Sequence, residues 1–182
     1  MISRSIQLAE GDLLLRPLQL ADLPAVYAAA IESLEAIKPW MSWMHDGYSI
    51  EETRSWIESL PGGWESDQNY AFGIFSALDG TALGGTGLNH VNRAYGLANL
   101  GYWVRSGRRG QGIAPRAARM VARFGFEQLG LVRAEIVVAE GNSASLRAAE
   151  KAGATREGLL RNRLFVGGKP HPAYMHSLVP GD

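Results

Sequence analysis

A turn rich in glycine and arginine, at residues 105–118, carries the strongest chemical signal in this sequence. Its residues are Arg-Ser-Gly-Arg-Arg-Gly-Gln-Gly-Ile-Ala-Pro-Arg-Ala-Ala. Gly110 and Gly112 have no side chains that would block a ligand, so the backbone N–H groups at the start of the following helix are able to surround an anion. Arg108 and Arg109 add positive charge to the same turn. The pattern predicts a phosphate-binding loop between a strand and a helix.

Two common nucleotide-binding motifs do not fit this turn. No Gly-Lys-Ser/Thr follows the glycines, which excludes a P-loop. The third glycine of a Gly-x-Gly-x-x-Gly fingerprint would fall on Pro115, which excludes that dinucleotide motif as well. The predicted phosphate must therefore belong to another kind of ligand.

Several short motifs together resemble one enzyme family. Arg109-x-x-Gly112-x-Ala114 fits the Arg/Gln-x-x-Gly-x-Gly/Ala signature of the GNAT acyl-CoA N-acyltransferases. Three further stretches follow the order of that family: Leu100-Gly101-Tyr102-Trp103-Val104, Asn142-x-x-Ser145, and Glu150-Lys151-Ala152-Gly153 leading to Glu157-Gly158. From about Leu13 to Leu178 the chain resembles this superfamily, and within it the RimJ/RimL type that acetylates N-termini of ribosomal proteins.

The resemblance implies that acetyl-CoA is the cosubstrate and that no metal takes part. It places the pyrophosphate of coenzyme A on the loop formed by Arg109, Gly110, Gln111, Gly112, Ile113, Ala114 and Pro115. The amide-rich arm of the cofactor is expected along the backbone of Tyr102, Trp103 and Val104, as an added strand. We expect the side chains of Tyr102 and Trp103 themselves to pack in the core. In the family, a bulge in this strand aims an N–H group at the thioester carbonyl.

The leaving thiolate needs a proton, and the resemblance implies Ser145 as the donor. Some relatives use a tyrosine seven residues after the asparagine, but that position is Ala149 here. Asn142 is expected to cap a short helix with Ser145 in its first turn, so that both face the sulfur end of the cofactor. The alternative is that Asn142 is only a cap and Ser145 only a polar residue of the first turn.

The sequence departs from the family pattern at the expected base. The family often has glutamate two residues before Gly-Tyr, whereas this chain has Asn99, which does not accept a proton usefully. His90, on the preceding strand, has a suitable pKa and is one candidate, although a lone histidine on a strand is more often structural. His45, Glu135 and an ordered water chain are the others. An α-amine with a pKa near 8 is about one-tenth neutral at pH 7 and needs little help, unlike a lysine amine.

The connector between the first two helices holds a dense cluster of aromatic and sulfur side chains that includes Trp40, Trp43 and His45. The resemblance places this connector over the acceptor groove, and such side chains suit an adaptable apolar surface. The alternative is that they pack the two helices against the sheet. Asn99 and Tyr174 are further candidates for binding the acceptor, although a proline replaces the acid that the family usually places two residues before Tyr174.

Composition limits the classes of partner. The formal net charge is zero, cysteine is absent, and the chain has neither a leader-like apolar start nor an apolar run of membrane-spanning length. We therefore expect a cytoplasmic protein without disulfides and without nucleic-acid or membrane partners.

Charge is nevertheless distributed unevenly. Residues 80–126 contain no acid but seven arginines: Arg93, Arg105, Arg108, Arg109, Arg116, Arg119 and Arg123. A ligand with several phosphates would explain this excess of positive charge. Arg116, Arg119 and Arg123 share one stripe of a helix, for which a solvated helix face is the alternative.

The elements around the turn are expected to form one domain, residues 1–182, in the order β-α-α-β-β-β-α-β-α-β-β. We expect strands near 13–17, 70–77, 82–91, 97–104, 131–139, 155–166 and 173–179, and helices near 22–33, 49–60, 113–130 and 142–153. Pro61-Gly62-Gly63 is expected to end the second helix. This order predicts an α/β (α+β) fold, a mixed and mostly antiparallel central sheet with helices on both faces. The family fold has the same order, with its middle strands splayed to admit the cofactor arm.

The residues and the resemblance together predict an N-acetyltransferase that moves an acetyl group from acetyl-CoA directly to a primary amine. The amine is either a protein N-terminus or a small molecule. A non-catalytic acyl-CoA-binding module is the alternative, because the glutamate and the tyrosine of the family pattern are both missing. The oligomeric state stays open, with a homodimer as one option.

Overall fold

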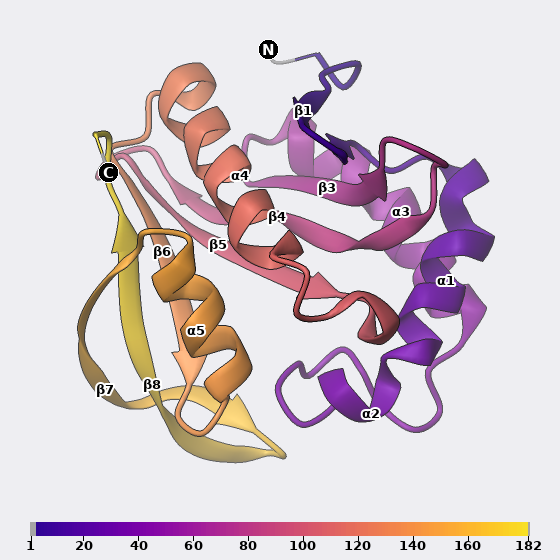
Figure 1. The fold of residues 1–182 in the computed structure, drawn as a ribbon. Helices are drawn as coiled ribbons and strands as arrows, with labels where there is room; N and C mark the ends of the chain where they lie inside the picture. The colour runs from indigo at the N-terminus through magenta and orange to yellow at the C-terminus, as the bar shows by residue number, and fades with distance from the viewer. Residues whose placement is uncertain (1–2, 182) are drawn as a thin grey trace.

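An eight-stranded sheet forms the centre of the structure, a computed structural model that describes residues 3–181 (Figure 1). The strands are β1 (Leu8–Glu10), β2 (Leu13–Arg16), β3 (Asn69–Ser76), β4 (Ala82–Asn92), β5 (Leu97–Val104), β6 (Arg133–Ala139), β7 (Thr155–Val166) and β8 (Lys169–Leu178). They lie in the order β1-β2-β3-β4-β5-β6-β8-β7. Neighbours are antiparallel except for β5 and β6, which are parallel.

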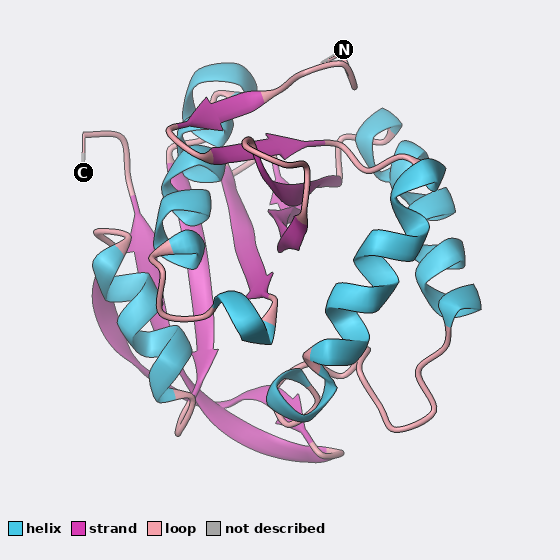
Figure 2. Cartoon of the chain, turned by 45° about the vertical axis from the view of Figure 1, so that its right-hand side comes forward, coloured by secondary structure: helices cyan, strands magenta, loops and turns pink. Residues whose placement is uncertain are grey.

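Helices cover both faces of this sheet, as Figure 2 shows. They are α1 (Leu23–Glu32), α2 (Leu34–Ile37), α3 (Ile50–Glu65), α4 (Ile113–Leu129) and α5 (Ser143–Lys151), with single 3₁₀ turns at Leu20–Asp22 and Ser106–Arg108. On one face, Phe72 of β3 meets Phe124 of α4 edge to face, with ring centroids 5.2 Å apart. On the other face, Phe75 of β3 belongs to the same cluster as Ile57 of α3. The predicted fold class is confirmed.

The middle of the sheet opens where β5 and β6 separate. Their parallel pairing covers only Leu97 with Arg133, Ala98 with Ala134, and Asn99 with Glu135. Beyond this point β5 continues against β4 and β6 continues against β8, and Figure 1 shows the two strands diverging. The predicted splaying of the middle strands is confirmed, and it leaves one edge of β5 without a neighbouring strand.

Three local expectations need correction. Strand β1 and the one-turn helix α2 were not expected. Helix α3 does not end at Pro61-Gly62-Gly63 but continues to Glu65. Tertiary packing explains this continuation, because Leu60 and Trp64 are both buried one turn apart. Gly63 also permits a close approach, since a Cβ atom there would lie 2.9 Å from Cβ of Asn69.

Acids from other elements neutralise part of the arginine-rich stretch. Arg105 pairs with Glu32 at 2.6 Å, and Arg116 on α4 pairs with Asp12 at 2.7 Å. Arg93 likewise pairs with Asp67. A ligand with several phosphates therefore does not account for the whole stretch.

Candidate active site

Two cavities meet at β5. The cationic cavity, of about 590 Å³, includes Arg108, Arg109, Arg147 and Lys151 in its lining. The aromatic cavity, of about 600 Å³, includes Trp43, Tyr48, Trp56 and Trp103 in its lining. The residues common to both linings are Met41, Tyr102 and Trp103. A ligand in one cavity is therefore able to reach a ligand in the other beside β5.

The glycine turn forms one wall of the cationic cavity. Gly110 and Gly112 have φ angles of 79° and 72°, in the left-handed region that favours glycine. A Cβ atom at either position would meet nothing within 4 Å, so the turn faces open space. Gly112 is the N-cap of α4, whose first N–H groups have no intrahelical partner. No acidic side chain among residues 3–181 lines this cavity, so its chemistry suits a ligand with several phosphates.

Helix α5 supplies two cations to the same cavity that sequence reasoning missed. Arg147 and Lys151 lie four residues apart and so share one face of the helix. This spacing, directly after the predicted Ser145, was the available signal. Trp40 also lines the cationic cavity, although it was expected at the acceptor. Gln111 lies in the turn but is not part of the lining.

A hydroxyl pair connects β5 with α5 inside the cationic cavity. The amide oxygen of Asn142 accepts from the Ser145 backbone N–H at 3.2 Å, which confirms the predicted cap. The Tyr102 hydroxyl donates to the Ser145 carbonyl oxygen at 3.1 Å and lies 3.2 Å from Ser145 Oγ. Burial raises the pKa of Tyr102, so its hydroxyl keeps its proton. The Tyr102 side chain therefore does more than fill the core, contrary to expectation.

Glycines form the floor of the aromatic cavity. Gly85 and Gly87 of β4 and Gly101 of β5 alternate along their strands, so all three face the same side of the sheet. A Cβ atom at Gly101 would meet nothing within 4 Å, whereas one at Gly85 would lie 2.7 Å from Nε1 of Trp103. The sequence shows Gly85 and Gly87 on either side of Thr86, but we did not predict from them that a cavity lies over this part of the sheet.

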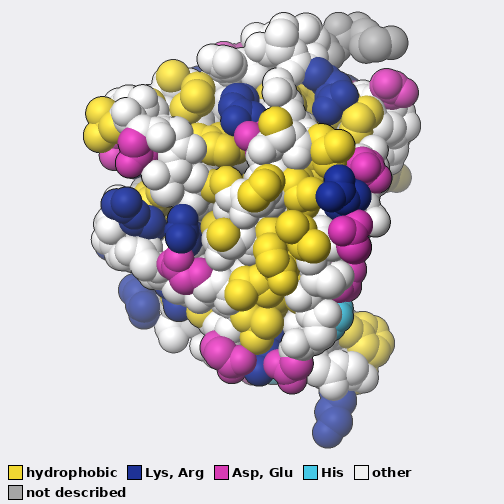
Figure 3. Space-filling model, turned by 90° about the vertical axis from the view of Figure 1, so that its right-hand side faces the viewer, with side chains coloured by type: hydrophobic (Ala, Val, Ile, Leu, Met, Phe, Trp, Pro, Cys, Tyr) yellow, Lys and Arg dark blue, Asp and Glu magenta, His cyan; other side chains and the backbone are white. Residues whose placement is uncertain are grey.

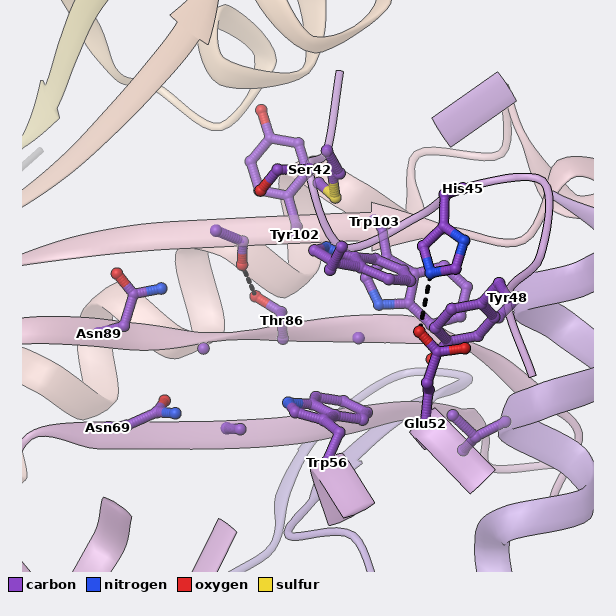
Figure 4. A pocket seen from close by; sticks show the side chains of 18 residues that line it. Ser42, His45, Tyr48, Glu52, Trp56, Asn69, Thr86, Asn89, Tyr102 and Trp103 are labelled. Carbon is purple, nitrogen blue, oxygen red and sulfur yellow. Dashed lines mark hydrogen bonds and ion pairs between the residues drawn. The ribbon is translucent and has the colours of Figure 1, made fainter. Parts of the chain in front are cut away.

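The walls of this cavity carry aromatic rings and one ion pair (Figure 4). Trp43 and Trp103 meet edge to face with centroids 6.1 Å apart. His45 Nε2 lies 2.7 Å from a carboxylate oxygen of Glu52, and this contact, together with hydrogen bonds from Ser49, holds the pKa of Glu52 below its usual value. Among the described residues no lysine or arginine lines this cavity, so it lacks the concentration of positive charge found in the cationic cavity.

The rim of the aromatic cavity is partly exposed. Trp43 is 39% exposed, although it belongs to an aromatic cluster. Figure 3, which views the molecule from the right-hand side of Figure 1, shows hydrophobic side chains gathered in the middle of that face with charged side chains around them. The exposed part of Trp43 gives the rim of the aromatic cavity an apolar surface.

Besides Gln111, three predicted site residues lie outside both linings. His90 is exposed, has a φ of 51°, and lies where an extra residue of β4 interrupts the register with β5. This irregularity is on β4, not on β5 where the family bulge was expected. The amide of Asn99 donates to Asn89 at 2.9 Å, and the ring of Tyr174 lies under Arg156 at 4.9 Å. Neither Asn99 nor Tyr174 is brought into a cavity wall.

Comparison with known proteins agrees with this arrangement. The chain matches the family model described as "Acetyltransferase (GNAT) domain" over residues 12–155. It is 32% identical over 155 residues to "Probable N-acetyltransferase YjcK" of Bacillus subtilis (strain 168), covering 84% of this chain and 86% of that protein.

Two solved structures extend the comparison. One is "Structure of a putative ribosomal-protein-serine acetyltransferase from Vibrio cholerae", with a TM-score of 0.84, 27% identity, and coverage of 98% of this chain and 100% of that one. The other is Mycobacterium smegmatis RimJ in complex with CoA-disulfide, with a TM-score of 0.83, 26% identity, and coverage of 92% and 82%.

The chain therefore belongs to the GNAT acetyltransferase family, and its resemblance to the RimJ/RimL type is confirmed. It is an N-acetyltransferase that uses acetyl-CoA to acetylate an amine, and a non-catalytic binding module is not favoured. Within residues 3–181, no group of three or more metal-ligating side chains is close enough to hold an ion. None of the helices in that range combines the length and apolarity needed to span a membrane.

Proposed function

We propose that the acceptor is the α-amine of a protein N-terminus and that it enters the aromatic cavity while acetyl-CoA occupies the cationic cavity. The observation that carries this proposal is the meeting of the two cavities at Tyr102 and Trp103, beside the free edge of β5. Positive charge is concentrated in the cationic lining, which favours that side of the sheet for the polyphosphate cofactor and leaves the other side for the amine. The similar structure from Vibrio cholerae is of a putative ribosomal-protein-serine acetyltransferase, which supports a ribosomal protein as one such acceptor.

The residues of the cationic cavity fit acetyl-CoA. In this proposal the loop Arg109–Pro115 holds the pyrophosphate through backbone N–H groups, with Gly110 and Gly112 leaving room for it. The four cations of the lining balance the phosphate charges. The free edge of β5 at Tyr102–Val104 offers backbone groups to the amides of the arm. When bound there, acetyl-CoA supplies the acetyl thioester.

The aromatic cavity fits an amine that is already partly neutral. An α-amine is about one-tenth neutral at pH 7, whereas a lysine amine is almost wholly protonated. The titratable side chains in the lining are His45 and Glu52. They contact each other, and Glu52 also accepts from Ser49, the N-cap of α3. A volume of about 600 Å³ is enough for more than one residue of a peptide. These features favour an N-terminal segment over a lysine side chain.

Ser145 is proposed to donate the proton that the leaving sulfur takes, with Asn142 fixing the turn that presents it. Tyr102 orients this serine, because its hydroxyl contacts both Ser145 oxygens.

Removing this hydroxyl pair should slow turnover without weakening cofactor binding. We expect Ser145→Ala to lower kcat by roughly 10–100-fold and Tyr102→Phe by about tenfold, with the acetyl-CoA KM within about twofold. The double variant should be no slower than Ser145→Ala, because both act through one proton. Thiol release at saturating amine measures kcat. Equal losses in kcat and in cofactor affinity would make the pair structural.

The proposed acceptor class is tested with a peptide panel read by mass spectrometry. Each peptide starts with serine or alanine, contains one internal lysine, and is prepared with either a free or a formylated N-terminus. We expect acetylation of the free peptides at the α-amine only. Acetylation of the lysine in formylated peptides, or of polyamines and amino sugars in preference to every peptide, would contradict the proposal.

A further inference from the structure

The sheet register offers a replacement for the carboxylate that the sequence lacks. Two residues before Gly101-Tyr102 the chain has Asn99, whose amide is not a proton acceptor. The residue paired with Asn99 on the neighbouring strand β6 is Glu135. Residues directly opposite in a ladder carry their side chains on the same face of the sheet. Glu135 therefore projects from the sheet at the same level as Asn99.

This level is the closed end of the gap between β5 and β6. Asn99 and Glu135 form the last pair before the strands separate. The glycine turn follows the opposite end of β5, after Val104. An arm whose phosphates lie at that turn and which runs along the free edge of β5 must direct its thioester toward the closed end. Glu135 thus lies beside the expected position of the reaction.

Glu135 also lies on the acceptor side of the sheet. Its row continues through Asn99 to Asn89 of β4 and Asn69 of β3, which are Cα partners in turn. Both Asn69 and Asn89 line the aromatic cavity, and Gly101, two residues after Asn99, belongs to its floor. The row therefore connects the cavity floor with one carboxylate at the gap.

In the part of the chain that the structure describes, the Glu135 carboxylate has one oxygen that is bound to a neighbour and one that is free. Its Oε1 accepts from Arg133 Nε at 2.8 Å, and within the described residues no hydrogen bond reaches Oε2. The side chain is 20% exposed. Arg133 also binds Glu157, an interaction that helps to hold the Glu157 pKa at about 2. On the side of β6 away from β5, Glu135 is paired with Ser177 of β8. The Ser177 hydroxyl donates to Glu157 and not to Glu135.

We propose that Glu135 accepts the proton that the acceptor amine loses, an assignment that rests on the proposed function. The amine nitrogen forms a bond to the acetyl carbon, and the carbon–sulfur bond breaks with its electron pair on sulfur. Sulfur takes a proton from Ser145, which regains one from bulk water. The surplus ammonium proton passes to Oε2 of Glu135, directly or through one water, and from there to bulk water, so the protein ends the cycle with no proton gained or lost. Arg133 fixes the carboxylate by its other oxygen, as an orienting group does for a general base.

The test is Glu135→Gln, which keeps the shape and an oxygen for Arg133 but removes the basic group. We expect kcat/KM for the peptide to fall about 100-fold at pH 7 and to recover as pH rises toward the amine pKa, with acetyl-CoA affinity unchanged. Glu157→Gln is the matched control, because it removes a carboxylate from the same arginine away from the gap; its activity should stay within about threefold of wild type.

A transplanted carboxylate makes the test decisive. Adding Asn99→Glu to Glu135→Gln moves the carboxylate to the paired residue on the neighbouring strand. The double variant should have a kcat/KM for the peptide at least about tenfold higher than that of Glu135→Gln alone. Full activity of Glu135→Gln, or an equal loss in Glu157→Gln, would overturn the assignment to Glu135. If the wild-type protein acetylates no peptide at all, the proposed function fails instead, so the two failures are distinguishable.

Discussion

Gly112→Asp should abolish acetyl-CoA binding while leaving the fold intact. A Cβ atom at this position meets nothing within 4 Å, so the carboxylate enters the open space of the cationic cavity. A carboxylate about 5 Å from one phosphate charge costs about 3 kcal/mol at an effective dielectric constant near 20. This corresponds to an affinity loss of at least about 100-fold, measured by calorimetric titration with acetyl-CoA.

Gly112→Asn separates charge from shape in this experiment. Asparagine and aspartate have similar size, and both tolerate the left-handed backbone that Gly112 adopts at a φ of 72°. Asn should therefore lose much less affinity than Asp. Thermal unfolding should show that Gly112→Asp is no less stable than Gly112→Asn, since an acid at a helix N-terminus is favourable. Equal binding by the two variants would contradict a phosphate site at this turn.

Gly101→Val should block the acceptor without affecting the cofactor. Gly101 lies on the floor of the aromatic cavity, and a Cβ atom there meets no protein atom within 4 Å. Its φ is not positive, and valine is favoured in strands, so the variant should fold. The added methyl groups occupy the space of the amine and displace it from the attacking position. We expect kcat/KM for the peptide to fall at least about 100-fold, with the acetyl-CoA dissociation constant within about threefold.

Gly158→Val is the matched control for this substitution. Gly158 is also a strand glycine with no atom within 4 Å of an added Cβ, but it lies on β7 and lines neither cavity. Its steady-state kinetics should stay near those of wild type. Loss of acetyl-CoA affinity in Gly101→Val, or equal loss of activity in Gly158→Val, would mean that the aromatic cavity is not the acceptor site.

Local patterns predicted those parts of the site that depend on neighbours in the chain. Two glycines with positive φ precede α4, and Asn142 caps α5, because turns and caps are decided within a few residues. The amphipathic spacing of α4, with Ala117 and Val121 fully buried, is equally local. These signals were enough to place a glycine turn between a strand and a helix and to predict the family fold.

Contacts between segments that are distant in the chain could not be predicted from local sequence patterns. Arg116 follows the same helical spacing as Arg119 and Arg123, yet it is bound to Asp12, which is 104 residues away. Helix α3 continues through Pro61 because buried residues on both sides of the proline hold it to the core. Trp40 lines the cationic cavity, although it was expected at the acceptor. His90 lies on β4 as expected but outside both cavities, although it was a candidate base.

The sequence by itself determined the glycine turn before α4, the capped helix that contains Ser145, and the family to which the chain belongs, since each is encoded in short runs of residues. The tertiary structure alone decided which side chains line the two cavities and the gap between β5 and β6. Strand register sets Glu135 beside Asn99, and the separation of β5 from β6 brings Tyr102 to Ser145. Register and strand separation are the result of packing across the whole sheet, so no local pattern could specify them.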